Sequence, residues 1–161
     1  MSLNVFITGA SSGIGAALAR EFARRGATLG LVARRKEALD ELIGTLDNSE
    51  KHYAYPCDVT DRDHLIAVGR EFDQITGGAD IVIANAGISV GVKTQYYEDL
   101  DVMEKVYATN VFAMASTFHA FIEPMMGRKR GTLVGIGSVG GIRGMPGTEA
   151  YCSSKSAVIT Y

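Results

Sequence analysis

The feature that most constrains this chain is a glycine-rich segment near its N-terminus, Thr8 to Gly15, which reads TGASSGIG. An apolar run, Leu3 to Thr8, precedes the segment, and a helical pattern from about Gly13 to Arg25 follows it. A helix N-terminus offers unpaired N–H groups and a favourable dipole to an anion, and glycines let the backbone turn tightly beside a ligand. The segment therefore predicts a dinucleotide-binding turn, with contacts from Gly9, Ser11, Ser12, Gly13 and Ile14.

Apolar runs alternate with helical patterns along the rest of the 161 residues. Strands are predicted at 28–33, 52–57, 80–84 and 132–138, and a last helix opens near Ala150. Gly26 is expected to end the first helix. Asp61 is expected to cap the helix that begins directly after Asp61. Apolar spacing predicts the inner faces of two helices, which comprise Ile14, Leu18 and Phe22 in one and Leu65, Val68, Phe72 and Ile75 in the other.

A further helix is predicted from about Asp101 to Met126, and its stretch Val106 to Ile122 is apolar almost all round. Such a helix is usually buried on more than one side, against a sheet and a second subunit. Strand–helix alternation with short turns predicts one α/β domain over residues 1–161, with a doubly wound parallel sheet of the Rossmann type. Because the chain stops at Tyr161 inside its last helix, we expect the N-terminal part of a longer domain, with a sheet incomplete at its C-terminal edge.

Right-handed crossovers place the carboxyl ends of all parallel strands on one edge of the sheet, where ligands bind. Residues that directly follow predicted strands should therefore meet there, although they are far apart in the sequence: Gly9, Asp58, Asn85 and Ser138.

Composition excludes several classes of partner and site. The net charge of −2 supplies no basic field for nucleic acid or for an anionic membrane, and no apolar run is long enough to span a bilayer. Two cysteines make neither a zinc site nor a disulfide framework, and free thiols suit a reducing compartment, so the expected location is cytoplasmic. The three histidines have no metal-ligand spacing, and no metal site is expected.

A second group of residues, Ser138, Tyr151 and Lys155, has the composition of a reaction centre. Tyr151 and Lys155 are four residues apart on a predicted helix and share one face. Tyrosine alone is a poor acid or base at neutral pH, but a nearby ammonium favours the phenolate and lowers its pKa. Such a tyrosine can exchange a proton with an alcohol or ketone, and Ser138 at a strand end could hydrogen-bond the same substrate oxygen.

Together with Asn85-Ala86-Gly87 and Asn110, these motifs resemble the classical branch of the short-chain dehydrogenase/reductase family in order and spacing. The resemblance implies that Tyr151 is the catalytic acid/base, that Lys155 lowers its pKa and holds the nicotinamide ribose, and that Ser138 orients the substrate carbonyl. Three further roles follow from the resemblance. Asn110 would support a water that relays protons, Asn85 to Gly87 would steady the sheet beside the cofactor, and Asp58 and Val59 would border the adenine. Asp58 alone could equally be a helix cap.

The end of the second strand indicates which nicotinamide cofactor is used. Relatives that use NAD typically carry an acidic residue there, whereas this chain has Ala33 followed by Arg34 and Arg35. A carboxylate would repel a 2′-phosphate, and a guanidinium can bind it through two hydrogen bonds. We therefore predict NADP(H), with Arg34 as the main contact and Arg35 either assisting or only solvated.

The function favoured by the sequence is an oxidoreductase that transfers hydride between NADP(H) and a small carbonyl or alcohol substrate. The alternatives are a cofactor-sensing or scaffold protein without turnover, and an inactive fragment. Asn110, Ser138, Tyr151 and Lys155 favour the enzyme, because a binding module has no need of all four. A homodimer or homotetramer is expected.

Overall fold

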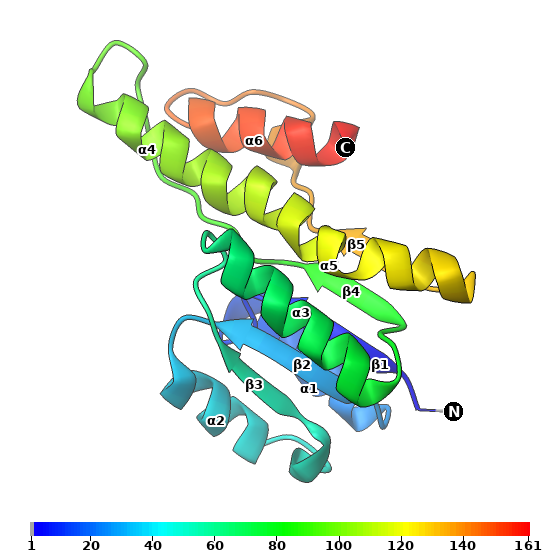
Figure 1. Ribbon diagram of the computed structural model, residues 1–161. Coiled ribbons are helices and arrows are strands. Elements are labelled where there is room, and N and C mark those ends of the chain that lie inside the picture. The colour runs from blue at the N-terminus through cyan, green and yellow to red at the C-terminus, as the bar shows by residue number, and fades with distance from the viewer. Residues whose placement is uncertain (1) are drawn as a thin grey trace.

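A computed structural model describes residues 2–161, which form a five-stranded parallel sheet in the order β3-β2-β1-β4-β5 (Figure 1). The central strand β1 pairs with β2 on one side and with β4 on the other, so that Phe6 lies between Gly30 and Val82. The doubly wound parallel sheet expected from the sequence is confirmed. The strands are β1 (Asn4–Thr8), β2 (Thr28–Ala33), β3 (Tyr53–Pro56), β4 (Ile81–Ala84) and β5 (Thr132–Gly135).

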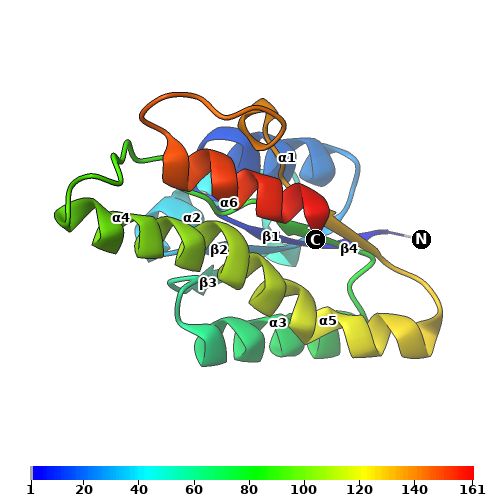
Figure 2. The same ribbon diagram turned by 90° about the horizontal axis from the view of Figure 1, so that it is seen from above.

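Helices cover both faces of this sheet, with α1 and α2 on one face and α3 and α5 on the other, while α6 packs alongside α4 (Figure 2). Among residues 2–161, no helix has the length and apolar character needed to cross a membrane. The helices are α1 (Gly13–Arg24), α2 (Lys36–Gly44), α3 (Arg62–Thr76), α4 (Glu98–Tyr107), α5 (Ala113–Arg128) and α6 (Glu149–Thr160), and short helical turns span Ser49–Lys51, Ala108–Phe112 and Val139–Gly141.

The two faces of the sheet are packed with different kinds of side chain. Aromatic rings fill the layer beneath α3 and α5, where the ring of Phe6 lies 5.0 Å from that of Phe121 and 5.5 Å from that of Phe72, measured between centroids. The layer beneath α1 and α2 consists mainly of alanine, leucine and other aliphatic side chains. Small residues let α1 approach the sheet closely, and α1 is the helix that follows the glycine turn.

The helix ends agree with their predicted signals. Gly26 has a φ of +78° and its N–H bonds back to the carbonyl of Ala23, which ends α1 as expected. The carboxylate of Asp61 accepts a hydrogen bond of 3.1 Å from the N–H of His64, which confirms the predicted N-cap of α3.

Two of the predicted inner faces are wrong in part. Ile14 is 60% exposed and lies beside a cavity, whereas the buried positions of α1 are Gly15, Ala16, Ala19 and Ala23. In α3 the side chain of Ile75 is also exposed, one residue before the helix ends at Thr76. Periodicity selects the large apolar residues, but the closest helix contacts require small ones.

The long helix predicted for residues 101–126 begins earlier, at Glu98, and is interrupted by a single π turn at Ala108–Phe112. The expectation of burial all round holds at Val106 and Phe121, but Phe112 is 59% exposed. The outer strands are shorter than predicted, at Tyr53–Pro56 and Thr132–Gly135. Both are edge strands, and Pro56 is tolerated at the edge because no further strand needs its missing N–H.

Candidate active site

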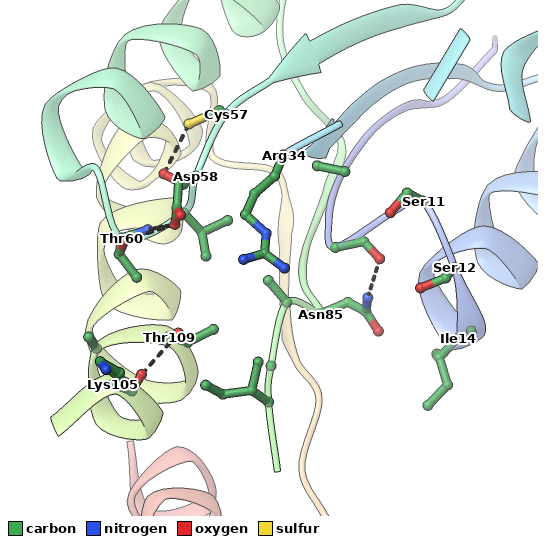
Figure 3. A pocket seen from close by; sticks show the side chains of 18 residues that line it. Ser11, Ser12, Ile14, Arg34, Cys57, Asp58, Thr60, Asn85, Lys105 and Thr109 are labelled. Carbon is green, nitrogen blue, oxygen red and sulfur yellow. Dashed lines mark hydrogen bonds between the residues drawn. The ribbon is translucent and has the colours of Figure 1, made fainter. Parts of the chain in front are cut away.

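A cavity of about 710 Å³ lies at the carboxyl-terminal edge of the sheet, beside the glycine turn (Figure 3). Gly9, Arg34, Asp58 and Asn85 follow four different strands and all line it, as parallel topology requires. Most of the predicted cofactor contacts are lining residues: Gly9, Ser11, Ser12, Gly13, Ile14, Arg34, Asp58, Val59, Asn85, Ala86 and Gly87. The predicted residues that do not line this cavity are Arg35, Ser138, Asn110, Tyr151 and Lys155.

The glycine turn is packed too tightly for side chains at two of its glycines. A Cβ atom on Gly15 would lie 2.3 Å from the carbonyl oxygen of Gly9. Gly9 itself has a φ of +65°, and a Cβ there would lie 2.8 Å from the Cα of Ala86. The helix that begins at Gly13 receives no side-chain cap from Ser12, so its first N–H groups face the cavity without a local acceptor. An anionic group is the natural partner for this helix terminus.

Thr8 fixes the turn to the neighbouring strand β4. Its buried hydroxyl oxygen accepts hydrogen bonds from the N–H groups of Asn85 (3.1 Å) and Ala86 (3.2 Å). In return, the amide of Asn85 donates to the carbonyls of Thr8 (3.0 Å) and Gly9 (3.1 Å). These four bonds join the end of β4 to the turn and hold the floor of the cavity in one arrangement.

Two adjacent arginines at the end of β2 take different directions. The exposed Arg34 side chain enters the cavity (Figure 3). Arg35 is the N-cap residue of α2 and does not line the cavity. Across the cavity, Asp58 accepts hydrogen bonds from the N–H and hydroxyl of Thr60 at 2.9 and 2.8 Å. These bonds, with a smaller contribution from the charge of Arg34, lower the pKa of the Asp58 carboxyl. An anionic Asp58 therefore faces a cationic Arg34.

The π turn places Asn110 in the interior, where its side chain is 2% exposed. The Asn110 amide exchanges two hydrogen bonds with the backbone of Ile88, accepting from its N–H at 2.8 Å and donating to its carbonyl at 3.0 Å. Because π turns break the regular ladder of a helix, they often occur where a side chain must be aimed at a site. Here the turn directs Asn110 toward the segment that follows β4.

Lys155 is buried beside Tyr151 on α6. The Lys155 ammonium lies 6.0 Å from the centroid of the Tyr151 ring and donates a hydrogen bond of 2.7 Å to the carbonyl of Ile136. Burial lowers the pKa of Lys155, because desolvation disfavours its charged form. Tyr151 is only partly buried and therefore open to a reactant on its exposed side.

Ser138 begins the short turn Val139–Gly141 at the end of β5, where its hydroxyl accepts a hydrogen bond of 3.1 Å from the N–H of Gly140. That turn packs directly on Tyr151, since a Cβ atom on Gly140 would lie 3.4 Å from Cε1 of the tyrosine. Ser138 thus follows β5 next to the turn that packs on Tyr151, Tyr151 and Lys155 lie on α6, and Asn110 is bonded to Ser154 of the same helix.

Sequence reasoning missed several residues that line the cavity. Lys105 belongs to α4 and Thr109 to the π turn that follows it, and the Thr109 hydroxyl donates to the carbonyl of Lys105 at 3.0 Å. Their four-residue spacing just before Asn110 indicates that they share one face of the helix. The surrounding stretch is mostly apolar, so it was interpreted as buried and not as part of a site. The other missed lining residues are Ala33, Cys57, Thr60, Ile88 and Ala108. Within residues 2–161, no cluster of three metal-ligating side chains occurs.

This chain is similar to known proteins along nearly its whole length. A family model described as short chain dehydrogenase matches residues 3–161. Nodulation protein G of Rhizobium sp. (strain N33) is 35% identical over 155 residues, which cover 96% of this chain and 62% of that protein. Epidermal retinol dehydrogenase 2 of Mus musculus is 37% identical over 159 residues, which cover 98% of this chain and 51% of that protein. The chain thus spans between half and two thirds of these relatives.

Solved structures of a dehydrogenase and a ketoreductase are also similar to this chain. An NAD⁺-bound xylitol dehydrogenase has a TM-score of 0.91 at 28% identity, over 98% of this chain and 61% of that one. A variant of actinorhodin polyketide ketoreductase with NADPH also has a TM-score of 0.91, at 27% identity over 99% of this chain and 62% of that one. Because the family model matches residues 3–161 of its 161 residues, this chain belongs to the short-chain dehydrogenase family.

Proposed function

We propose that this protein is an NADP(H)-dependent oxidoreductase that interconverts a carbonyl compound and the corresponding alcohol. The observation that carries the proposal is the placement of the buried Lys155 ammonium 6.0 Å from the Tyr151 ring centroid, on a helix next to the cavity. Most lysines keep their charge in solvent, whereas this one is buried beside a phenol. The family relationship supports the same chemistry.

The cavity residues fit a dinucleotide. The uncapped start of α1 would accept the pyrophosphate, and Asp58 with Val59 would border the adenine. The nicotinamide would supply or accept the hydride. Lys155 would hold its ribose, and Asn85 to Gly87 form the cavity wall beside it. Relatives of this fold have been solved with either NAD⁺ or NADPH, so the choice depends on local residues.

Local residues favour NADP(H). Arg34 directs its guanidinium into the cavity, and Ala33 before it supplies no carboxylate that would repel a 2′-phosphate. Arg35 lies outside the cavity lining, which supports the reading in which it is only solvated. NADP(H) in turn favours reduction of a carbonyl as the working direction.

The proton of the reaction would pass through Tyr151. In the reducing direction its hydroxyl gives a proton to the substrate oxygen, and Lys155 stabilises the phenolate that remains. Ser138 would donate a hydrogen bond to the same substrate oxygen and hold it near the phenol. Asn110, buried behind the helix, would support the water that returns a proton through Lys155.

Replacing Tyr151 with phenylalanine tests the proposal in the intact protein. We expect Tyr151→Phe to lower kcat by about 10²–10⁴-fold, the usual contribution of a positioned acid/base, in a screen of carbonyl compounds with NADPH. The Kd for NADPH, measured by fluorescence titration, should stay within about threefold because no turn residue is altered. A variant that retains turnover would refute the role of Tyr151. A wild-type protein that binds NADPH but turns over no substrate would favour the sensing alternative.

Two expectations about the assembled protein stay predictions. Large apolar side chains are exposed at Tyr97 just before α4, at Phe112 in the π turn and at Met126 in α5, which is consistent with the expected homodimer or homotetramer. Sedimentation of the intact protein measures that oligomeric state. The cytoplasmic location also stays a prediction.

A further inference from the structure

Ser154 lies at the point where α6 packs against the π turn, and its side chain has no exposed surface. It stands next to Lys155 in the sequence, on the face of α6 that meets Asn110. Serine is a neutral or unfavourable residue inside a helix unless its hydroxyl has a specific partner. A fully buried serine between a catalytic tyrosine and a catalytic lysine therefore calls for a partner that explains it.

The Ser154 hydroxyl takes part in two hydrogen bonds of opposite direction. It donates to the carbonyl of Tyr151 at 2.8 Å, one turn earlier on the same helix. It accepts from Nδ2 of Asn110 at 3.0 Å, across the interface between the two helices. A hydroxyl has only one proton to donate, so the bond to Tyr151 leaves Ser154 as an acceptor toward Asn110. This direction requires the NH₂ side of the Asn110 amide to face α6.

The orientation of the Asn110 amide decides whether its oxygen or its NH₂ group lies near the Lys155 ammonium. Nδ2 of Asn110 donates to Ser154 and to the Ile88 carbonyl, while Oδ1 accepts from the Ile88 N–H and lies beside the segment that contains Gly87. A Cβ atom on Gly87 would lie 3.3 Å from Oδ1 and 3.6 Å from the Lys155 ammonium, so both atoms border the same small space. An amide oxygen stabilises a neighbouring cation or a water bound to it, whereas an NH₂ group would repel the ammonium.

We propose that Ser154 is a positioning residue, which adds a third hydrogen bond to the Asn110 amide oriented by Ile88 and joins the π turn to the helix that presents Tyr151. This inference rests on the proposed function of Tyr151 and Lys155. Ser154 touches no reacting atom and acts only through Asn110. Because Lys155 is held on its other side by the Ile136 carbonyl, a shift of Asn110 changes the environment of the ammonium without releasing it.

Ser153 provides a matched control on the same helix. Its hydroxyl donates only to carbonyls of its own helix, those of Glu149 at 2.6 Å and Ala150 at 3.2 Å. Ser153→Ala therefore removes an intrahelical bond of the kind that Ser154 makes to Tyr151, but leaves Asn110 untouched. A difference between Ser154→Ala and Ser153→Ala reports the bond to Asn110.

The first measurement is kinetic, on the intact protein with NADPH and a carbonyl substrate. We expect Ser154→Ala to lower kcat roughly tenfold, the equivalent of one net hydrogen bond, with the Kd for NADPH within about twofold of wild type. The pH dependence of kcat should shift, because a poorly held Oδ1 stabilises the Lys155 ammonium less. Ser153→Ala should leave kcat and its pH profile unchanged. A Ser154→Ala variant whose kcat and pH profile match those of Ser153→Ala would overturn the proposal.

The second measurement does not depend on turnover. Hydrogen exchange of the Asn110 side-chain amide, followed by NMR in ¹⁵N-labelled protein, should be slow in wild type and in Ser153→Ala, and roughly tenfold faster in Ser154→Ala. Equal exchange in all three proteins would overturn the positioning of Asn110, whatever the enzyme does. A wild-type protein without turnover but with this exchange pattern would contradict the proposed function and still support the hold on Asn110. Should Ser154→Ala fail to fold, Ser154→Cys replaces the hydroxyl with a weaker acceptor of similar shape and serves the same comparison.

Discussion

The two ends of the candidate site are built in different ways. At the glycine-turn end, backbone groups and close steric contacts hold the geometry, as in the packing of Gly15 on the Gly9 carbonyl and the paired bonds between Thr8 and β4. At the α6 end, the geometry depends on bonds made by side chains, from Ser154 to Asn110 and from Lys155 to Ile136. The turn end is continuous with the sheet core, whereas α6 packs mainly on α4, on the π turn and on the turn Val139–Gly141.

Because of this difference, we expect substitutions at the two ends to affect cofactor binding and turnover separately. A change at the turn end disturbs the strands as well as the cavity, so it should lower folding stability and cofactor affinity together. A change at the α6 end alters a few side-chain bonds, so it should lower kcat and leave the cavity intact. Substitutions at Gly15 and Thr8 test the first half of this comparison, and those at Tyr151 and Ser154 test the second. A substitution at Arg34 tests the choice of cofactor separately.

The largest effect is expected at Gly15. Gly15→Ala would place a Cβ atom 2.3 Å from a backbone oxygen, which cannot move without displacing the turn. We expect the free energy of unfolding to fall by about 3 kcal/mol, as for overpacked cores, and NADPH affinity to fall with it. Denaturant titration and fluorescence titration measure the two quantities.

Gly44 is the control for that substitution, because a Cβ atom there would meet nothing within 4 Å. Gly44→Ala should leave stability unchanged or raise it by up to about 1 kcal/mol, as expected for alanine in a helix. If Gly15→Ala were as stable as Gly44→Ala and still bound NADPH, the turn would not be held by the steric contact that we describe.

A smaller loss is expected at Thr8. Thr8→Val keeps the shape of the side chain but leaves the N–H groups of Asn85 and Ala86 without their shared acceptor. The expected cost is about 2 kcal/mol in the free energy of unfolding, with weaker NADPH binding. Thr76→Val is the matched control, because the Thr76 hydroxyl donates only to a carbonyl of its own helix, that of Phe72. Equal denaturation midpoints for the two variants would show that the Thr8 hydroxyl does not hold β4 to the turn.

The smallest effect, and the most selective, is expected at the exposed Arg34. Arg34→Ala should raise the Kd for NADPH about tenfold and leave both the Kd for NADH and the melting temperature unchanged, because only a contact to the 2′-phosphate is lost. Arg35→Ala should alter none of these values, since its side chain does not line the cavity. Comparable affinity for NADH and NADPH in the wild type, or an Arg34→Ala variant that keeps a preference for NADPH, would exclude the assignment.

Much of the glycine-turn end could be predicted because its determinants are local. The strand Thr28–Ala33, the end of α1 at Gly26 and the cap at Asp61 each depend on a few neighbouring residues, and all three agree with the structure. Parallel topology then placed the ends of four strands together. Prediction was less successful where residues distant in the sequence compete, as on the inner face of α1, where alanines and not Ile14 meet the sheet.

The π turn shows the same limit at the α6 end. Nothing in the periodicity of residues 101–126 predicts an interruption at Ala108–Phe112, because the extra residue is accommodated by bonds from Asn110 to Ile88 and Ser154. Those partners are 22 and 44 positions away, and only folding brings them together. For this reason the sequence alone did not predict a role for Ser154, because the role of a serine inside a helix depends on its hydrogen-bond partner.

By itself, the sequence determined the alternation of strands and helices, the turn that only glycines can form, and the order of the residues of a dehydrogenase site. These features depend on backbone conformation and on the spacing of side chains along one element. Tertiary structure decided which of two adjacent arginines enters the cavity, which face of α1 is buried and how the Asn110 amide is oriented. Each of these depends on atoms supplied by other elements, because the direction of a side chain is fixed by what packs and hydrogen-bonds around it.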